Sequence, residues 1–224
     1  MQKKVHIFVG IILFHLVFLI AQDAKARFEM MNTIRRDKLD LVLPGAMRDN
    51  NVDVWIHVIR RGDTDPMNLD FGVTMGHVVF TDNGGDRIER ALFGHRFAAL
   101  ADETIYDIFG DEEDLTEYIK KRNPKTIAVN MSNWITVGDG LSYTGYNNLV
   151  NLLGKKYAKR LISSENVITD FSARRVQSEI IAFANICEIQ RRVMEEGLRM
   201  IKPGLTSREE VGWWAQDELS KYGI

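Results

Sequence analysis

The sequence predicts an α/β fold, a mixed β-sheet flanked by helices, followed by two further helices. Two observations lead to this fold class. Between residues 52 and 163, β-branched and aromatic runs alternate with helical patterns after one antiparallel hairpin, which is typical of a mixed sheet with helices on its faces. From Val176 onward, apolar residues recur only with helical spacing, so the end of the chain is expected to hold no strand.

The α/β region is expected to span residues 27–165. Turn residues separate its elements, including an Asn-Gly-Gly sequence that favours a hairpin turn. The expected elements are a helical segment over 28–52 broken at Pro44-Gly45, strands at 52–59, 76–81, 87–93, 126–130 and 160–163, and helices at 111–122 and 146–156.

A linker is expected at 166–174, and residues 175–224 are expected to form two amphipathic helices. Pro203-Gly204 ends the first of them, and Thr206 with Glu209 three residues later predicts a capping box at the start of the second. About 50 residues of helix are marginal when isolated, because two such helices cannot bury their apolar faces against each other alone. We therefore expect this region to be the truncated start of a larger domain.

The first 26 residues have the organisation of a signal peptide. Lys3 and Lys4 precede an apolar run over 5–20, and a small-x-small cleavage pattern follows at Ala24-Lys25-Ala26. The apolar run is shorter than the roughly 20 residues of a membrane-spanning helix, so a cleaved signal is favoured over an uncleaved anchor. We expect an exported protein, periplasmic or secreted, whose mature chain begins near Arg27.

The composition is that of an ordinary globular protein. The sequence holds 29 basic and 31 acidic side chains; removing residues 1–26 leaves 26 and 30, a net charge of −4. This balance, without a basic stripe, excludes nucleic acid as an expected partner. Cys187 is the single cysteine and cannot form an internal disulfide, so the fold relies on its core.

Several motifs resemble those of one enzyme family. A long helix is followed by Ile201-Lys-Pro-Gly-Leu-Thr-Ser-Arg-Glu-Glu, and the earlier region contains Arg35-Arg-Asp-Lys-Leu-Asp, Leu43-Pro-Gly-Ala-Met-Arg, Asp53-Val-Trp-Ile and Asp139-Gly-Leu-Ser-Tyr-Thr-Gly. Together they resemble the pita-bread metallopeptidases, which include aminopeptidase P (Xaa-Pro aminopeptidase), prolidase and creatinase-like proteins. The resemblance implies a creatinase-type N-terminal domain, followed by the first two helices of a truncated pita-bread α+β catalytic domain.

The resemblance also implies an activity, namely removal of a residue that precedes proline or hydrolysis of an Xaa-Pro dipeptide. The family uses two divalent metal ions, with manganese expected, held by two aspartates, one histidine and two glutamates. All five histidines of this chain lie at or before His95, whereas the family's metal-binding histidine comes from the catalytic domain. We therefore expect no catalytic residue and no metal ligand within this chain, and an inactive fragment.

Arg60 and Arg61 are the candidate substrate contacts. They follow the strand expected at 52–59, and ligand crevices in open α/β sheets form at the carboxyl ends of strands. In the family, the N-terminal domain often packs near a neighbouring subunit's active site. The resemblance thus implies a homo-oligomer in which these arginines contact a proline-containing peptide; the alternative is a solvated exit from the strand.

Three other candidate sites are weaker. His57, His77 and His95 would form a metal triad only if the fold gathered them, and each lies on or beside a strand without a close ligand partner. Asp111-Glu-Glu-Asp114 lacks the glycine and ligand spacing of a calcium loop, and acidic residues at a helix N-terminus complement its dipole. Gly138-Asp-Gly140 lacks the third glycine of a dinucleotide-binding fingerprint.

Two alternative functions stay open. A non-catalytic binding or assembly module could use the creatinase-type domain alone. A creatinase-like hydrolase would act on a small C–N substrate without the metal site. The presence or absence of the metal-ligand set in a continuation of the sequence would distinguish these alternatives from a peptidase.

Overall fold

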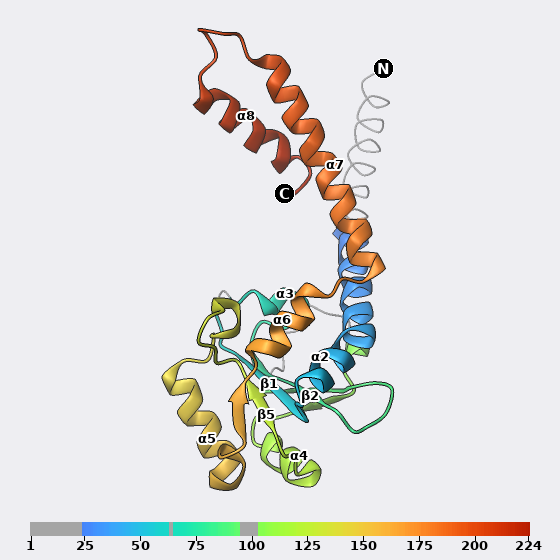
Figure 1. Cartoon of the computed structure of the whole chain (residues 1–224), viewed down its shortest axis with the longest axis vertical. Helices are drawn as coiled ribbons and strands as arrows, with labels where there is room; N and C mark the ends of the chain where they lie inside the picture. The colour runs from blue at the N-terminus through green and yellow to red at the C-terminus, as the bar shows by residue number, and fades with distance from the viewer. Residues whose placement is uncertain (1–23, 63–64, 95–102) are drawn as a thin grey trace, which may run out of the picture. The chain divides into compact units, whose positions relative to one another are not determined.

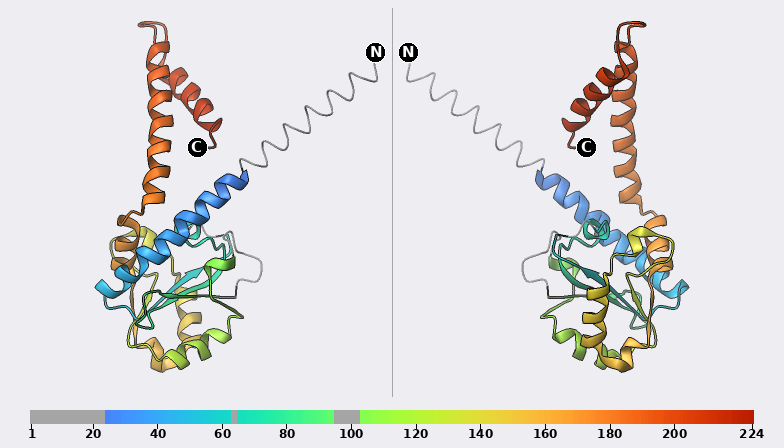
Figure 2. Two further views of the ribbon diagram at one scale, coloured as in Figure 1. Left: turned by 90° about the vertical axis from the view of Figure 1, so that its right-hand side faces the viewer. Right: turned by 90° about the vertical axis from the view of Figure 1, so that its left-hand side faces the viewer.

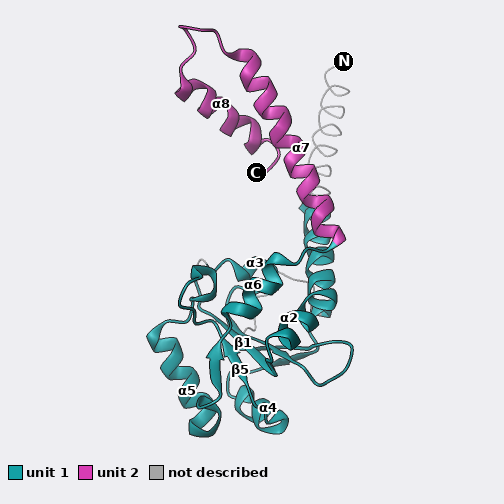
Figure 3. Ribbon diagram, in the orientation of Figure 1, with its two compact units in different colours: residues 1–176 teal, residues 177–224 magenta. Residues whose placement is uncertain are grey.

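The computed structural model describes residues 24–62, 65–94 and 103–224 (Figure 1). They form two compact units that divide between Val176 and Gln177 (Figure 3). Unit 1 is an α/β domain with a six-stranded sheet, and unit 2 is a pair of helices. Most of the expected signal peptide lies outside the described residues. Residues 24–26 begin a helical segment that continues to residue 41, and cleavage near Arg27 stays a prediction.

The sheet of unit 1 is mixed, as predicted. In space its strands follow the order β4-β3-β2-β1-β5-β6. β2 is antiparallel to both neighbours and every other pair is parallel, so the carboxyl ends of five strands meet the amino end of β2 at one edge. The strands are β1 (Val54–Ile59), β2 (Gly76–Thr81), β3 (Glu89–Phe93), β4 (Ile108–Gly110), β5 (Ile127–Val129) and β6 (Leu161–Ser163).

Helices cover both faces of the sheet, which gives a three-layer α/β arrangement (Figures 1 and 2). The helical segment 24–41, α2, α3 and α6 pack on one face, and α4 and α5 pack on the other. Short 3₁₀ turns occur at η1 (Glu103–Ile105) and η2 (Thr136–Gly138). The α-helices are α2 (Leu43–Asp49), α3 (Met67–Phe71), α4 (Asp114–Arg122), α5 (Tyr143–Ala158) and α6 (Glu165–Ala173).

β1 lies in the middle of both cores. All six of its residues are buried, which explains the continuous apolar character of this segment rather than a polar–apolar alternation. Trp55 points to the α2 and α6 face, where its ring lies 5.4 Å from that of Phe71 and 6.1 Å from that of Phe171. Ile56 points to the α4 and α5 face. The side chains of β1 therefore belong to the cores on both faces of the sheet.

The prediction of a linker at 166–174 is wrong, because this segment lies within α6. Val167, Ile168 and Phe171 are buried in the same core as Trp55. The segment is rich in Asn, Thr, Asp and Ser, which have low helix propensity, and its contacts with the sheet domain override that local preference. The domain therefore continues to Val176, about ten residues beyond the predicted boundary.

Unit 2 consists of α7 (Gln177–Met200) and α8 (Arg208–Ser220). A Cβ at Gly197 would lie 3.1 Å from the Trp214 ring, so the glycine permits the close approach of the two helices. On α7, the side chains of Glu188 and Arg192 pair at 3.9 Å and those of Glu195 and Arg199 at 3.8 Å. These exposed pairs contribute little, only about 0.2–0.5 kcal/mol each.

The capping box of α8 begins one residue later than predicted. Ser207 Oγ accepts a hydrogen bond from the Glu210 N–H at 3.1 Å, and Glu210 Oε2 accepts one from the Ser207 N–H at 2.8 Å. The Thr206 hydroxyl accepts instead from the Lys202 N–H at 2.9 Å. The Thr206 hydroxyl therefore stabilises the turn that follows α7, and Ser207 is the residue that caps α8.

The helix pair keeps much of its apolar surface exposed. No residue of α8 is buried, and Cys187 of α7 is exposed. The exposed large apolar side chains of α7 and α8 are Ile180, Ile181, Phe183, Ile186, Met194, Leu198, Met200 and Trp213. Within the described ranges, no helix is both long enough and apolar enough to span a membrane.

Candidate functional site

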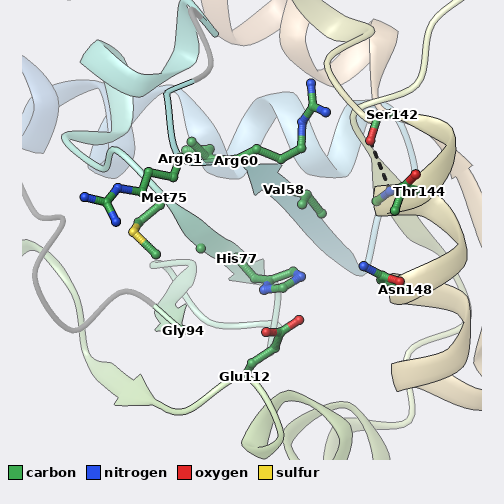
Figure 4. Close-up of a pocket in the computed structure, with 13 residues that line it drawn as sticks. Val58, Arg60, Arg61, Met75, His77, Gly94, Glu112, Ser142, Thr144 and Asn148 are labelled. Carbon is green, nitrogen blue, oxygen red and sulfur yellow. Dashed lines mark hydrogen bonds between the residues drawn. The ribbon is translucent and has the colours of Figure 1, made fainter.

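A cavity of about 430 Å³ lies in unit 1 at the edge where the carboxyl ends of the parallel strands meet (Figure 4). Crevices at this edge are the usual ligand sites of open α/β sheets, and small-molecule pockets commonly measure about 300–1,000 Å³. The cavity is lined by Val58, Ile59, Arg60, Arg61, Met75, Gly76, His77, Gly94, Glu112, Ser142, Thr144, Gly145 and Asn148.

Arg60 and Arg61, the predicted substrate contacts, both line this cavity. They occupy the two positions after Ile59, the last residue of β1, so both side chains start at the same edge, and in Figure 4 their guanidinium groups point in different directions. In the view of Figure 4, His77 lies between these arginines and Glu112. Placement at a strand end thus correctly located a cavity, while contact with a substrate stays a prediction.

His77 contributes a buried polar ring to the cavity. It is only 8% exposed, and its Nδ1 has no hydrogen-bond partner among the described residues. Burial lowers the pKa of His77, and this effect outweighs the opposing influence of the Glu112 charge and the Phe93 backbone. The imidazole is therefore neutral at pH 7, and its buried Nδ1 has an unused hydrogen-bonding capacity.

The N-terminus of α5 forms another wall. Ser142 caps the helix by accepting a hydrogen bond from the Gly145 N–H at 3.1 Å. The first turn contains no acidic residue. The positive end of the helix dipole is consequently not compensated locally, and the adjoining Thr144 hydroxyl and Asn148 amide add hydrogen-bonding groups.

Most of these lining residues were not predicted. Glu112 follows β4, whose Ile-Phe-Gly sequence lies between Asp107 and Asp111 and contains a glycine, so it does not stand out as a strand. His77 is the second residue of a strand that was predicted, but its position at the cavity depends on the antiparallel course of β2. The rule that placed Arg60 and Arg61 at a strand end would have found Glu112 as well, had β4 been recognised.

A second polar pair lies on the other face of β1. His57 is fully buried, and its Nε2 lies 2.8 Å from Asp65 Oδ2. Asp65 Oδ1 also accepts a hydrogen bond from the Met67 N–H at 2.9 Å, which joins the pair to the start of α3. Burial by itself would raise the pKa of Asp65, but the hydrogen bond and charge of His57 lower it overall. His57 is thus a paired core histidine.

His57 and His77 cannot hold one metal ion together. His57 lies opposite Val78 in the β1–β2 pair, and His77 lies opposite Val58, so the two imidazoles project to opposite faces of the sheet. His95 lies outside the described residues. In the part of the chain that the structure describes, no group of three or more His, Cys, Asp or Glu side chains could hold a metal ion.

The remaining candidates are local structure. Asp114 Oδ2 accepts a hydrogen bond from the Asp111 N–H at 2.9 Å at the start of α4, as the interpretation of helix N-terminal acids predicts. Gly138 ends the turn η2. Asp139 Oδ1 accepts a hydrogen bond from the Ser132 N–H at 3.1 Å, which closes the loop onto itself.

Comparison with known proteins identifies the fold. No protein-family model matches the sequence, and no curated protein matches it significantly. The structure is similar to an Xaa-Pro dipeptidase from Bacillus anthracis, with a TM-score of 0.55 and 15% identity over 84% of this chain and 49% of that one. The chain shares its fold with Xaa-Pro peptidases.

A second neighbour is the X-Pro aminopeptidase from Thermotoga maritima MSB8. Its TM-score is 0.54 and its identity 13%, over 79% of this chain and 49% of that one. The chain therefore spans about half the length of these peptidase structures. The predicted resemblance and the predicted α/β fold class are confirmed. At such low identity, the likeness concerns the fold.

Proposed function

We propose that this chain is the N-terminal part of an exported Xaa-Pro aminopeptidase-like metallopeptidase, which hydrolyses the bond before proline in peptides. The observation that carries the proposal is the order of its parts. An α/β domain leads into a long helix ended at Pro203-Gly204 and a capped second helix, and Xaa-Pro peptidases share this fold over about half their length.

The hydrolytic chemistry needs groups that the described residues do not supply. In such enzymes two divalent ions, expected here to be manganese, polarise the scissile carbonyl and supply a hydroxide. Among the described residues no cluster fits these ions, so no hydrolytic step is assigned to them. The role proposed for unit 1 is to support a catalytic domain in a homo-oligomer, with Arg60 and Arg61 contacting a proline-containing peptide.

Unit 2 supports the proposal that a larger catalytic domain contains α7 and α8. A groove of about 440 Å³ between the two helices is lined mostly by apolar side chains, including Val193, Leu198, Val211 and Trp214. Further apolar side chains of α7 are exposed. Surfaces of this kind are typical of a face that packs against more protein.

The test is to express this chain alone and together with its downstream coding sequence, and to assay both with Mn²⁺ on an Xaa-Pro dipeptide and on a longer Xaa-Pro peptide. We expect hydrolysis only from the longer protein. The proposal is overturned if the continuation lacks the two aspartates, the histidine and the two glutamates, or cleaves neither peptide. Metal-independent hydrolysis of a small C–N substrate would indicate the creatinase-like alternative.

Export has its own test. N-terminal sequencing of the protein recovered from its native host should give a mature chain that begins near Arg27. Recovery of the chain with Met1 intact in the membrane fraction would support the anchored alternative instead.

A non-catalytic binding or assembly module is the second candidate function. The observation that favours it is that unit 1 has a core on both faces of its sheet and a cavity of its own. It predicts a cooperative melt, a defined oligomer and a protease-resistant segment 177–224 for the 224-residue chain. Aggregation or rapid cleavage within 177–224 would instead favour the first candidate.

A further inference from the structure

The cavity at the carboxyl edge of the sheet gathers charges of both signs that the hydrolytic chemistry does not need. We propose that it binds a small zwitterion, a free amino acid or a dipeptide, through separate groups for the carboxylate and the ammonium. The site lies wholly within unit 1 and does not depend on the proposed peptidase function. Arg60 and Arg61, assigned above to a proline-containing peptide, are here assigned to a ligand bound within their own domain, and the two assignments are alternatives for the same side chains.

The carboxylate is assigned to Arg60, Arg61 and the N-terminus of α5, all of which line the cavity. Guanidinium groups form strong, charge-assisted hydrogen bonds with carboxylates. The first N–H groups of a helix have no intrahelical acceptor, and only the Gly145 N–H is used by the Ser142 cap. The uncompensated dipole of α5 therefore adds to the attraction for an anionic group.

The ammonium is assigned to Glu112. This carboxylate lines the same cavity, on the far side of His77 from the arginines in the view of Figure 4. A negative charge at this position repels a polyanion such as phosphate and attracts a positively charged amino group. A ligand that carries both charges satisfies both sides of the cavity, whereas a simple anion leaves Glu112 unmatched.

His77 is the independent sign that a ligand completes this cavity. Its side chain is more than nine-tenths buried, it lines the cavity, and its Nδ1 has no partner among the described residues. Buried polar atoms are nearly always hydrogen-bonded, so an unpaired one at a cavity wall points to a missing partner. A neutral imidazole can accept a hydrogen bond from an ammonium or donate one to a carboxylate.

Isothermal titration calorimetry of the whole 224-residue chain tests the proposal. The probes are L-alanine, L-proline, alanyl-alanine and alanyl-proline, compared with acetate, ethylammonium and inorganic phosphate. We expect at least one zwitterion to bind with one-to-one stoichiometry, at least tenfold more tightly than any single-charge probe. The proposal is overturned if no zwitterion binds or if phosphate binds most tightly; neither result bears on hydrolysis by a longer protein.

Variants locate the binding site. Arg61→Gln and Glu112→Gln should each weaken zwitterion binding at least tenfold, and Glu112→Gln should not weaken the binding of acetate. The matched controls are Arg87→Gln and Glu117→Gln, at two residues that do not line the cavity. Arg87 forms an ion pair with Asp107 at 2.6 Å, and Glu117 lies on the exposed side of α4. Loss of affinity in the controls, or unchanged affinity in both cavity variants, contradicts the proposal.

His77→Phe keeps a ring of similar size and removes the unpaired nitrogen. It should weaken binding at least tenfold while the chain still melts cooperatively, and unchanged affinity would contradict the role of His77. If this core variant fails to fold, the outcome still rests on Arg61 and Glu112, because both side chains are exposed and neither belongs to the core.

Discussion

The side chain of Asn130 hydrogen-bonds both backbone polar groups of Val58. Its Oδ1 accepts from the Val58 N–H at 3.1 Å, and its Nδ2 donates to the Val58 carbonyl at 3.0 Å. β5 ends at Val129, so the amide of Asn130 replaces the next backbone unit in the parallel ladder with β1. This substitution holds the end of β1 in place just before Arg60 and Arg61.

Asn130→Ala should lower the free energy of unfolding by about 2–6 kcal/mol, because two backbone groups in a buried setting lose their partners at about 1–3 kcal/mol each. Urea denaturation of unit 1 measures the effect. Asn83→Ala, in the exposed hairpin turn, is the control and should change stability by less than about 0.5 kcal/mol. Equal losses in the two variants would show that Asn130 has no special role.

The Tyr118 hydroxyl joins β2 and β3 to α4. It lies 2.8 Å from Thr81 Oγ1 and donates to Glu89 Oε1 at 2.7 Å, and burial raises its pKa. Tyr118→Phe should therefore destabilise the domain by about 1–3 kcal/mol, because the buried Thr81 hydroxyl loses its partner. Tyr143→Phe is the control: it removes the hydroxyl of a residue that is 82% exposed and should leave the stability unchanged. Thermal melts of both variants measure the difference, and equal melting temperatures would contradict the role of the Tyr118 hydroxyl.

His77 makes stability depend on pH. Burial lowers the pKa of the folded imidazole below its ordinary value of 6.5, so the unfolded chain binds the proton first. Its contribution is fully present above pH 6.5 and is lost as the pH falls below that value, by at most about 1.4 kcal/mol per pH unit. Denaturation curves at pH 7.5 and 5.5 should show this loss in the native chain. The loss should be smaller in His77→Phe, and an equal loss in both proteins would contradict the assignment.

Ser207, not Thr206, should control the start of α8 through its capping box. Ser207→Ala should weaken the first turn by about 1 kcal/mol, which corresponds to roughly fivefold faster amide hydrogen exchange in residues 209–211. Glu209→Ala provides the comparison, since Glu210 and not Glu209 makes the reciprocal hydrogen bond. Faster exchange in Glu209→Ala than in Ser207→Ala would instead support the capping box of Thr206 and Glu209 that was predicted from the sequence.

The sequence predicts long, regular elements better than short ones. The strand at β1 and the helix at α7 are recognised because their apolar patterns extend over several residues. β5 and β6 have only three residues each but were predicted from the apolar runs that contain them. β4 ends in glycine, α3 has five residues, and α6 has a composition typical of a loop, so none of these three was recognised. The capping box was displaced by one residue because Thr206 and Ser207 are both good caps, and only the hydrogen bond to Lys202 distinguishes them.

The residues of the candidate site also divide into those that the sequence could place and those that it could not. Arg60 and Arg61 could be placed at a strand end from the sequence, because this requires only the boundary of one element. Glu112 and His77 could not be brought to them, since that requires the pairing of β4 with β3 and of β2 with β1. Pairings between strands join residues far apart in the chain, and no local pattern records which strand lies beside which.

The sequence by itself determined the α/β class and the two-part organisation, because periodicity and turn residues are local properties. Its motifs carried the resemblance to Xaa-Pro peptidases. Only the tertiary structure decided that α6 belongs to the sheet domain, that Asn130 extends the ladder of β1, and that His77 is buried with an unpaired nitrogen at the wall of a cavity. Burial and hydrogen-bond partnership depend on neighbours from the whole chain, and they are defined only when the chain is folded.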